Sequence, residues 1–409
     1  MSLVIADPAP RVAVSDLSAP PAWLTGGRIP CLDGLRAFAV LLVVYAHASR
    51  TTGFPDLGGL PNLRLGHLGV EAFLVVSGFL ISTLLLRELH RTGQVQVGRF
   101  YRARLLKIVP PLAALLLVLA VLRSCGVAEL AWYDFAAAAT FTTNFLPHAN
   151  KLLAHTWTLA IQEHFYLLWP VLLVTCSLAR SRLLLWLCIA GCLVLRCLVV
   201  GSSTEYGYVA LNWTCCRLDG VAVGCLLALA AYDPAWRTRL NRLVHDGRLL
   251  LLVGGVLLAS RWFAGVSWRY WLGASFTLHS FCFAILLWAV IQRSGTWVGR
   301  CFDHPLVTAV GAASFSLYIW QQLFLQPCSS PWWCAFPQNV LFALLAGLAS
   351  YWLIEKPILN FKRQQRVAAR RAPAEPPVEA FRIQVWEDVA RQSAAVQPDN
   401  RRLCGQGAS

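Results

Sequence analysis

Charged residues are scarce in this chain. They make up 13% of its 409 residues, whereas 57% are hydrophobic, and soluble domains carry about a quarter charged residues. The apolar residues form long runs without a polar face, as at 112–121, 249–258 and 341–348. Helices that are apolar all round are buried or face lipid. The composition therefore excludes an ordinary soluble domain and predicts an all-α membrane protein.

Several motifs are also missing. The sequence has no Gly-x-Gly-x-x-Gly nucleotide motif, no tandem repeat and no Cys-x-x-Cys spacing that suits zinc. Most of the 14 cysteines lie inside apolar runs, where they serve as small hydrophobic residues. Cys328 and Cys334 flank a short loop and form a disulfide if that loop is extracytoplasmic; two free thiols are the equal alternative. No metal is expected.

The positive charge is distributed between the apolar runs. The formal net charge is +15, and a basic patch on one face would indicate a nucleic-acid partner. Here Lys and Arg occupy alternate connections, as the positive-inside rule for membrane proteins produces. We therefore expect membrane lipid as a partner and no nucleic acid.

Hydropathy predicts a bundle of about ten transmembrane helices. A further apolar segment near 132–146 is only about 14 residues long, too short to cross a hydrocarbon core of about 30 Å. We expect that segment to be re-entrant or interfacial. The ten predicted spans are 33–50, 66–87, 106–123, 158–178, 183–200, 211–232, 248–264, 271–291, 306–326 and 336–355.

Loop charge predicts the orientation. The connection 87–107 holds six Lys or Arg residues, whereas 51–65 holds almost none, so both termini are expected in the cytoplasm. The predicted domain organisation is a flexible cytoplasmic tail at 1–28, a transmembrane domain at 29–362 and a second flexible cytoplasmic tail at 363–409.

The first predicted span carries two costly polar residues, Arg36 and His47. They are eleven residues apart, so they share one helix face and are separated by about 16 Å along its axis. Intramembrane charges normally face a cavity and serve a function. The alternative is structural: His47 hydrogen-bonds a neighbouring carbonyl group, and Arg36 anchors the helix end.

Two later spans carry further charges. Glu163 and Tyr166 share a helix face on the fourth span; an interfacial aromatic belt explains Trp157 and Trp169 nearby, but not Glu163. Arg217 and Asp219 lie two residues apart on the sixth span, hence on opposite faces. Each is expected to find a partner on another helix, most simply as a structural ion pair.

The basic segment 100–110 contains Arg102, Arg104 and Lys107 among aromatic residues. Positive-inside charge alone accounts for it. The functional alternative is a phosphate-binding site, because arginine offers bidentate geometry to phosphate and aromatic rings can stack on an adenine.

Taken together, these segments resemble the acyltransferase-3 family of membrane O-acyltransferases. The first span is similar to the family's opening helix, with Arg36 and His47 separated by ten residues. The resemblance extends over about 28–362. The other similar blocks are 69–81, 100–110, 157–170, 217–219, 314–320 and 354–357.

The resemblance implies a ten-helix bundle that transfers an acyl group, often acetyl, from cytoplasmic acyl-CoA. The implied acceptor is a hydroxyl of a bacterial surface or secreted polysaccharide, or a lipid-linked glycan, at the cytoplasmic (inner) membrane. His47 would be the general base or would form an acyl-histidine, supported by Arg36, and Glu163 would orient the imidazole if the fold brings it near. Arg102 and Arg104, with Lys107, would bind the donor.

The sequence departs from the family pattern at several positions. Glu71 stands where Asp is usual, and Gln321 replaces a common His. Ala103 occupies a usual Arg position, and Gln162 and His164 flank Glu163 in place of the usual Glu and Gln. The substrate is therefore less determined than the reaction class.

Two rival functions use the same residues. A transporter or glycan flippase would line a permeation path with Arg36, His47 and Glu163. A membrane anchor or partner-binding protein would use its buried charges only to hold helices together. The ordered family-like blocks and the lack of a repeat favour the enzyme.

Overall fold

The computed structural model describes residues 19–56, 64–203, 205–327, 332–361 and 364. The chain divides into two units, 1–358 and 359–409, and the site described below lies in the first. Over the described residues the structure is helical and contains no strand, as an all-α fold requires.

Some of the predictions fall elsewhere in the chain. Most of both predicted tails (1–18 and the residues from 365 onward) and Cys328 of the proposed disulfide lie outside the described residues. Within the predicted N-terminal tail, the short helix α1 (Ala22–Thr25) is described. Its Leu24 is fully buried, and Trp23 stacks on Phe79 with 6.4 Å between ring centroids.

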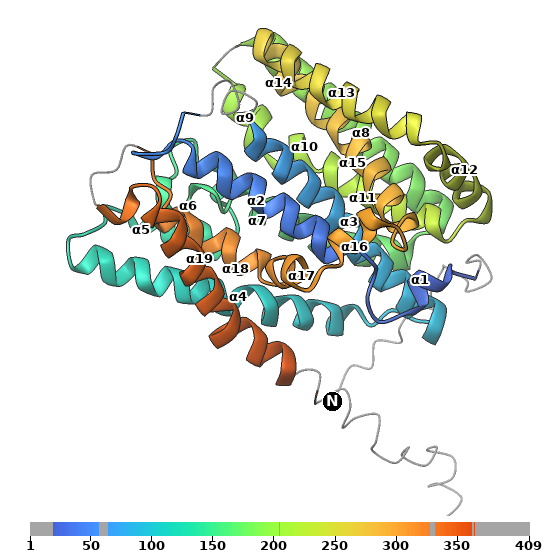
Figure 1. Ribbon diagram of the computed structural model, residues 1–409, viewed down its shortest axis with the longest axis horizontal. Helices are drawn as coiled ribbons and strands as arrows, with labels where there is room; N and C mark the ends of the chain where they lie inside the picture. The colour runs from blue at the N-terminus through green and yellow to red at the C-terminus, as the bar shows by residue number, and fades with distance from the viewer. Residues whose placement is uncertain (1–18, 57–63, 204, 328–331, 362–363, 365–409) are drawn as a thin grey trace, which may run out of the picture. The chain divides into compact units, whose positions relative to one another are not determined.

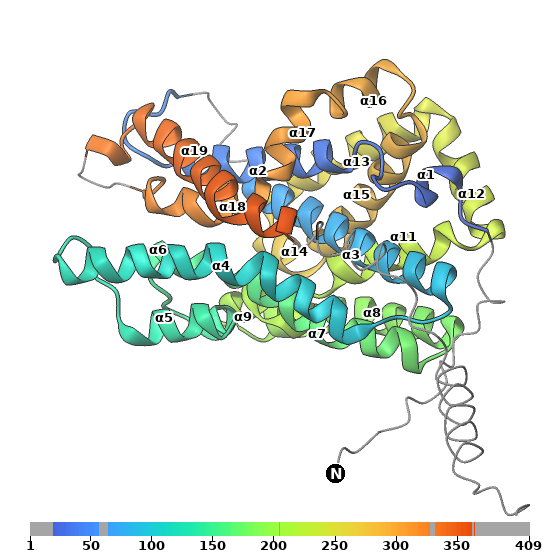
Figure 2. The ribbon, with the colours of Figure 1, turned by 90° about the horizontal axis from the view of Figure 1, so that it is seen from below.

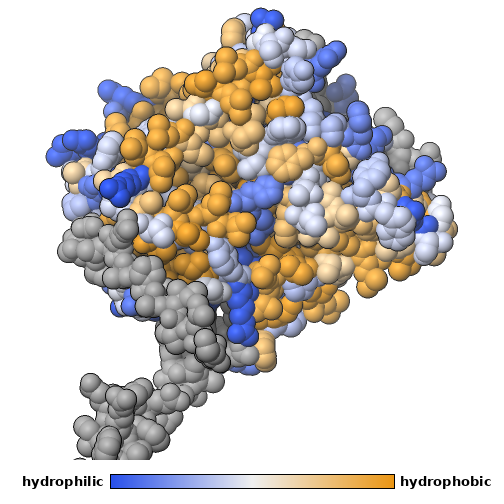
Figure 3. All heavy atoms as spheres, turned by 180° about the vertical axis from the view of Figure 1, so that it is seen from behind, coloured by the Kyte–Doolittle hydropathy of each residue, from blue (hydrophilic) through white to orange (hydrophobic). Residues whose placement is uncertain are grey.

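Six described helices are long and apolar enough to cross a membrane (Figure 1), and each corresponds to a predicted span. Their outward side chains are apolar: Leu251 and Leu353 are 78% and 77% exposed, and apolar side chains cover much of the face in Figure 3. The architecture is that of a multi-pass all-α membrane protein. The six are α3 (Leu65–Thr92), α4 (Val97–Ser124), α8 (Leu178–Ser202), α13 (Gly247–Val266), α15 (Ser275–Gln292) and Gln338–Phe361, which starts as α19 (Gln338–Ser350).

The other four predicted spans are helical but shorter, broken or more polar, so a count of ten is not established. Helix α2 (Leu32–Ala48) has 17 residues, and α7 (Trp157–Thr175) contains Gln162, Glu163 and His164. The remaining two are interrupted. One consists of α9 (Gly207–Asn212), α10 (Thr214–Arg217) and α11 (Asp219–Ala231), and the other of α17 (Pro305–Ala312), α18 (Ser314–Trp320) and η4 (Gln321–Leu323).

The basic segment 100–110 is not the connecting loop that we expected. It is the first part of α4, a continuous 28-residue helix with Pro110 and Pro111 inside it. Helix α3 ends at Thr92, and Gly93 caps it in the left-handed conformation with a φ of 74°. Only residues 93–96 connect α3 to α4. The Arg, Leu and Lys residues that follow are strong helix formers.

The segment near 132–146 contains no helix long enough to cross a membrane. It contains α5 (Trp132–Ala139) and η3 (Thr143–Phe145), followed by α6 (Lys151–Ala154). Helix α5 has eight residues, about 12 Å of length. The Asp134 carboxylate accepts hydrogen bonds from the backbone N–H groups of Ala131 (3.1 Å) and Asn150 (3.0 Å). Helix α5 contacts both α4 and α6, and Figure 2 shows α5 alongside α4.

Small residues let α3 pack closely on two neighbouring helices. A Cβ atom at Gly78 would lie 2.0 Å from the Val221 carbonyl oxygen of α11, and one at Gly69 would lie 2.5 Å from the Ala39 carbonyl oxygen of α2. Glycine-mediated approach of this kind is typical of membrane helices. It fixes α2 and α11 on either side of α3. The remaining short helices are α12 (Pro234–His245), α14 (Trp268–Gly273), α16 (Trp297–Phe302), η5 (Trp332–Cys334) and η6 (Tyr351–Glu355).

Candidate functional site

Three cavities follow one another beside α2, and they contain most of the predicted site residues. The His47 cavity has a volume of about 400 Å³. The Arg104 cavity, about 40 Å³, is lined by Arg36, Arg104, Lys107 and Glu163 among others. Between them lies a narrow cavity of about 30 Å³.

Shared wall residues establish this order. Val43, Val70 and Tyr318 line both the His47 cavity and the narrow cavity. Phe73, Leu159, Gln162 and Phe315 line both the narrow cavity and the Arg104 cavity. The narrow cavity is mostly apolar and holds about the volume of one water molecule.

His47 lies in the last turn of α2 and lines the largest of the three cavities. Its Nδ1 atom is buried and, within the described part of the chain, has no hydrogen-bond partner. The side chain of Gln321 lies beside the imidazole, and both of its amide atoms are likewise unpaired. Gln321 is therefore a neighbouring polar side chain of the imidazole with its hydrogen-bonding groups unused among the described residues.

A second histidine faces the same cavity. The His155 Nε2 atom lies 3.0 Å from the Ile319 carbonyl oxygen. The Tyr318 hydroxyl lies 2.6 Å from the Thr158 Oγ1 atom and 2.5 Å from the His155 carbonyl oxygen. These contacts join α18 to the start of α7, and they hold His155 and Tyr318 in the cavity wall.

The segment that follows α5 forms part of the cavity wall. Thr143, Leu146 and Lys151 line it. Tyr208 also lines the cavity and carries a side-chain hydroxyl group. That hydroxyl donates to the carbonyl groups of Leu146 and of Asn144 (3.1 Å). The segment near 132–146 thus serves as part of the wall of the His47 cavity.

The Arg104 cavity contains two of the three predicted donor-binding residues, Arg104 and Lys107. The Arg104 guanidinium lies over the Tyr166 ring at 4.5 Å from its centroid and over Phe100 at 5.8 Å. Glu163 lines the same cavity, and its Oε1 atom is buried with no hydrogen-bond partner among the described residues. Lys107 also lines it, 3.8 Å from the Glu355 carboxylate, which accepts a 2.9 Å hydrogen bond from Ser316.

The structure separates some residues that we expected to act together. Arg36 and Glu163 line the Arg104 cavity, whereas His47 lines the cavity at the other end of α2. Arg36 instead approaches Asp33 at 3.5 Å. The fold therefore does not bring Glu163 to the imidazole. Arg102 is exposed and lies outside the lining of the three cavities.

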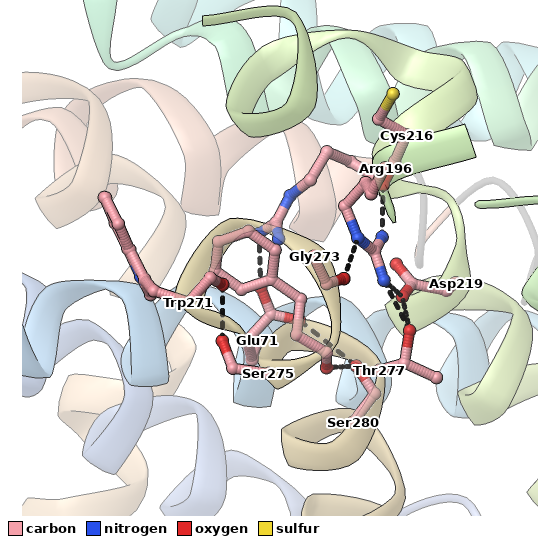
Figure 4. A network of polar contacts seen from close by, with 11 residues as sticks. Glu71, Arg196, Cys216, Asp219, Trp271, Gly273, Ser275, Thr277 and Ser280 are labelled. Carbon is pink, nitrogen blue, oxygen red and sulfur yellow. Dashed lines mark hydrogen bonds and ion pairs between the residues drawn. The ribbon is translucent and has the colours of Figure 1, made fainter. Parts of the chain in front are cut away.

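The charges at the start of the sixth span form two buried ion pairs with other helices, which confirms that prediction. Arg217 binds Glu71 of α3, and Asp219 lies 2.7 Å from Arg196 of α8. Figure 4 shows the surrounding hydrogen bonds, in which Thr277 donates to Asp219 at 2.6 Å and Ser280 to Glu71 at 3.1 Å. All four charged side chains are at most 1% exposed.

Sequence reasoning missed several residues of the His47 cavity. Arg50, Arg64, His67 and His155 line it, although they come from the ends of different helices. The only sequence signal was their position next to the family-like blocks. Tyr318, by contrast, lies within the block 314–320.

Comparison with known proteins gives a consistent result. The family described as "Acyltransferase domain", acyltransferase-3, matches residues 29–355. The chain is 30% identical over 319 residues to "Putative O-acetyltransferase SACOL0978" of Staphylococcus aureus (strain COL), covering 71% of this chain and 50% of the relative. It is 27% identical over 360 residues to "O-acetyltransferase OatA" of S. aureus (strain NCTC 8325 / PS 47), covering 81% and 57%.

The chain spans about half the length of the curated relatives it matches. No solved structure matches it.

Proposed function

The chain belongs to the acyltransferase-3 family, and from this premise we propose that it is a membrane O-acyltransferase. It moves an acyl group, acetyl in particular, from cytoplasmic acyl-CoA to a hydroxyl of a surface or secreted polysaccharide. The proposed location is a bacterial cytoplasmic membrane, with both termini in the cytoplasm. The observation that carries the proposal is the line of cavities beside α2, with His47 at one end and basic residues at the other.

The donor is proposed to enter at the Arg104 cavity. Arg36, Arg104 and Lys107 supply positive charge there, and a guanidinium group binds phosphate through paired hydrogen bonds. The acyl end of the donor then points along α2 through the narrow cavity, which must widen to admit it. His47 lies about 16 Å from Arg36 along this helix, so a long, thin donor arm suits the geometry.

At His47, the imidazole takes the proton of the acceptor hydroxyl. The hydroxyl oxygen attacks the thioester carbonyl carbon, and a new C–O bond forms as the C–S bond breaks. The CoA sulfur leaves and recovers the proton from the imidazolium. General-base catalysis of this type contributes about 10²–10⁴-fold. An acyl-histidine intermediate is the alternative route. Since Glu163 lies at the donor end, its proposed role is to hold Arg104 and not to orient His47.

The narrow cavity bears on the transporter alternative. A permeation path for a glycan requires a polar passage, and this cavity is lined mainly by Ala, Val, Leu and Phe. No observation on the described residues specifically favours transport.

The proposal is tested with the purified full-length protein and labelled acetyl-CoA. Transfer of label to a glycan together with release of free CoA supports it. CoA release without a labelled glycan indicates hydrolysis, and neither event in the presence of bacterial surface glycans would contradict an acyltransferase.

Replacing both donor-end arginines should weaken acyl-CoA binding. We expect Arg102→Ala with Arg104→Ala to raise the Kd for acetyl-CoA by about tenfold or more, as expected for loss of one or two charge-assisted hydrogen bonds. Arg104 should account for most of this, because the Arg102 side chain is exposed and its charge is screened. Isothermal titration measures the effect.

The matched control is Arg180→Ala, an exposed arginine at the start of α8. Its Kd should equal that of the unmodified protein. An unchanged Kd in the double variant would show that Arg102 and Arg104 do not bind the donor and serve only as positive-inside charge that sets the membrane orientation.

A further inference from the structure

The wall of the His47 cavity is strongly basic. It contains Arg50, Arg64 and Lys151 together with three histidines, and none of its described residues is acidic. Asp56, the acidic residue nearest in sequence to Arg50, is exposed and outside this lining, and Glu71, the nearest to Arg64, is paired with Arg217. The described wall of the cavity therefore carries three permanent positive charges and no carboxylate.

The contrast with the neighbouring ion pairs shows that this excess is local. Arg196 and Arg217 each contact a carboxylate a short distance away in the same bundle. Charges in a membrane protein are normally matched in this way, because an unmatched charge at bilayer depth is costly. The cationic residues of the His47 cavity have no such carboxylate on its wall.

Arg64 is held in a fixed position for binding. Its guanidinium lies over the Trp271 ring, 3.6 Å from the ring centroid. Its Nη1 atom is buried and has no hydrogen-bond partner in the described part of the chain. The ring face restricts the guanidinium while leaving N–H donors available, and a guanidinium binds carboxylate or phosphate in a bidentate manner.

The other cationic groups extend this site to the surface. Arg50 and Lys151 are exposed, so they form the rim, while His47 lies further in. Trp157, Tyr208 and Tyr318 add aromatic surface to the wall. A ligand with an anionic group and a polar body with apolar faces, as a saccharide has, fits this arrangement.

We infer that the acceptor is an anionic saccharide, whose carboxylate or phosphate binds Arg64 while a hydroxyl lies at His47. This inference rests on the proposed acyltransferase function and specifies its substrate class. Arg50 and Lys151 attract the charged glycan at the entrance, and Arg64 selects it.

The test uses three forms of one oligosaccharide with the purified full-length protein. The probes are an oligogalacturonate, the same oligomer with its carboxyl groups reduced to neutral hydroxymethyl groups, and a phosphorylated form of the neutral oligomer. We expect a charged form to bind at least tenfold more tightly than the neutral form, with a preference that falls as salt is raised. Comparison of the two charged forms tells whether carboxylate or phosphate is preferred.

Arg64→Gln should weaken binding of the charged form about tenfold, which lowers the ratio of charged to neutral affinity. Binding of the neutral form should be unchanged. Arg269→Gln is the matched control, because Arg269 is exposed, also lies over a tryptophan ring (Trp268, 5.8 Å) and is outside the cavity lining. It should behave as the unmodified protein.

Equal binding of charged and neutral forms, or an equal loss of both in Arg64→Gln, overturns the inference. So does weaker acetyl-CoA binding in Arg64→Gln, since that would make the basic cavity the donor site. Acetyl transfer to the neutral oligomer without preference refutes this inference alone. Preferred binding of a charged form without transfer to any glycan refutes the acyltransferase proposal and leaves the anionic site.

Discussion

His47→Ala should lose acyl transfer by at least about 100-fold. The expectation follows from the position of the imidazole: it lines the largest of the three cavities, with one ring nitrogen unpaired among the described residues. Loss of a general base costs about 10²–10⁴-fold in rate. The measurement is the rate of labelled acetyl transfer from acetyl-CoA to glycan by the purified variant.

Two further measurements separate catalysis from folding. The Kd for acetyl-CoA should be unchanged, because Arg104 and Lys107 lie at the other end of the line of cavities. The amount of protein in the membrane should also be unchanged. His245→Ala, an exposed histidine at the end of α12, serves as the matched control.

Transfer by His47→Ala at the rate of the unmodified protein would contradict a catalytic role for His47. Incubation with labelled acetyl-CoA in the absence of a glycan then distinguishes the two routes. Label retained on the protein but not on His47→Ala indicates an acyl-histidine, whereas no retained label indicates direct transfer.

Glu71→Gln should destabilise the protein by about 3–5 kcal/mol, the cost of removing one partner of a buried ion pair. Both Glu71 and Arg217 have fully buried side chains, and the Glu71 carboxylate also accepts a hydrogen bond from Ser280. The substitution leaves Arg217 buried without its anion. The expected result is a lower Tm in detergent and less protein in the membrane.

A second ion pair, whose acidic residue Glu88 also lies in α3, provides the control. Glu88 approaches Arg99 at 3.8 Å, with side chains 21% and 50% exposed, and such pairs contribute at most about 1 kcal/mol. Glu88→Gln should therefore leave the Tm nearly unchanged. The double variant Glu71→Leu with Arg217→Met removes both charges and should recover much of the lost stability. Equal Tm values for Glu71→Gln and Glu88→Gln would show that the buried pair is not structural.

The two sets of buried charges thus have different roles. The Glu71–Arg217 pair joins α3 to α10, and the Arg196–Asp219 pair joins α8 to α11. The charges beside α2 face cavities, and in the His47 cavity they lack a carboxylate on the described wall. Matched charges indicate stability, whereas unmatched charges around a cavity indicate a ligand.

The sequence by itself determined the class of the protein and the helix that organises its site. Long apolar runs require lipid or a buried environment, because a helix without a polar face has no side that is stable in contact with water. The spacing of Arg36 and His47 on a regular helix fixes their shared face and their separation. The lack of pairing between Arg217 and Asp219 follows from the same geometry.

Only the tertiary structure decided which residues meet. Glu163 and His47 both lie in predicted spans, yet Glu163 lines the Arg104 cavity and His47 lines the cavity at the end of α2. The basic wall of the His47 cavity combines Arg50 from the end of α2, Arg64 from the start of α3 and Lys151 from α6. Helical periodicity relates residues within one helix, and contacts between distant helix ends depend on how the whole bundle packs.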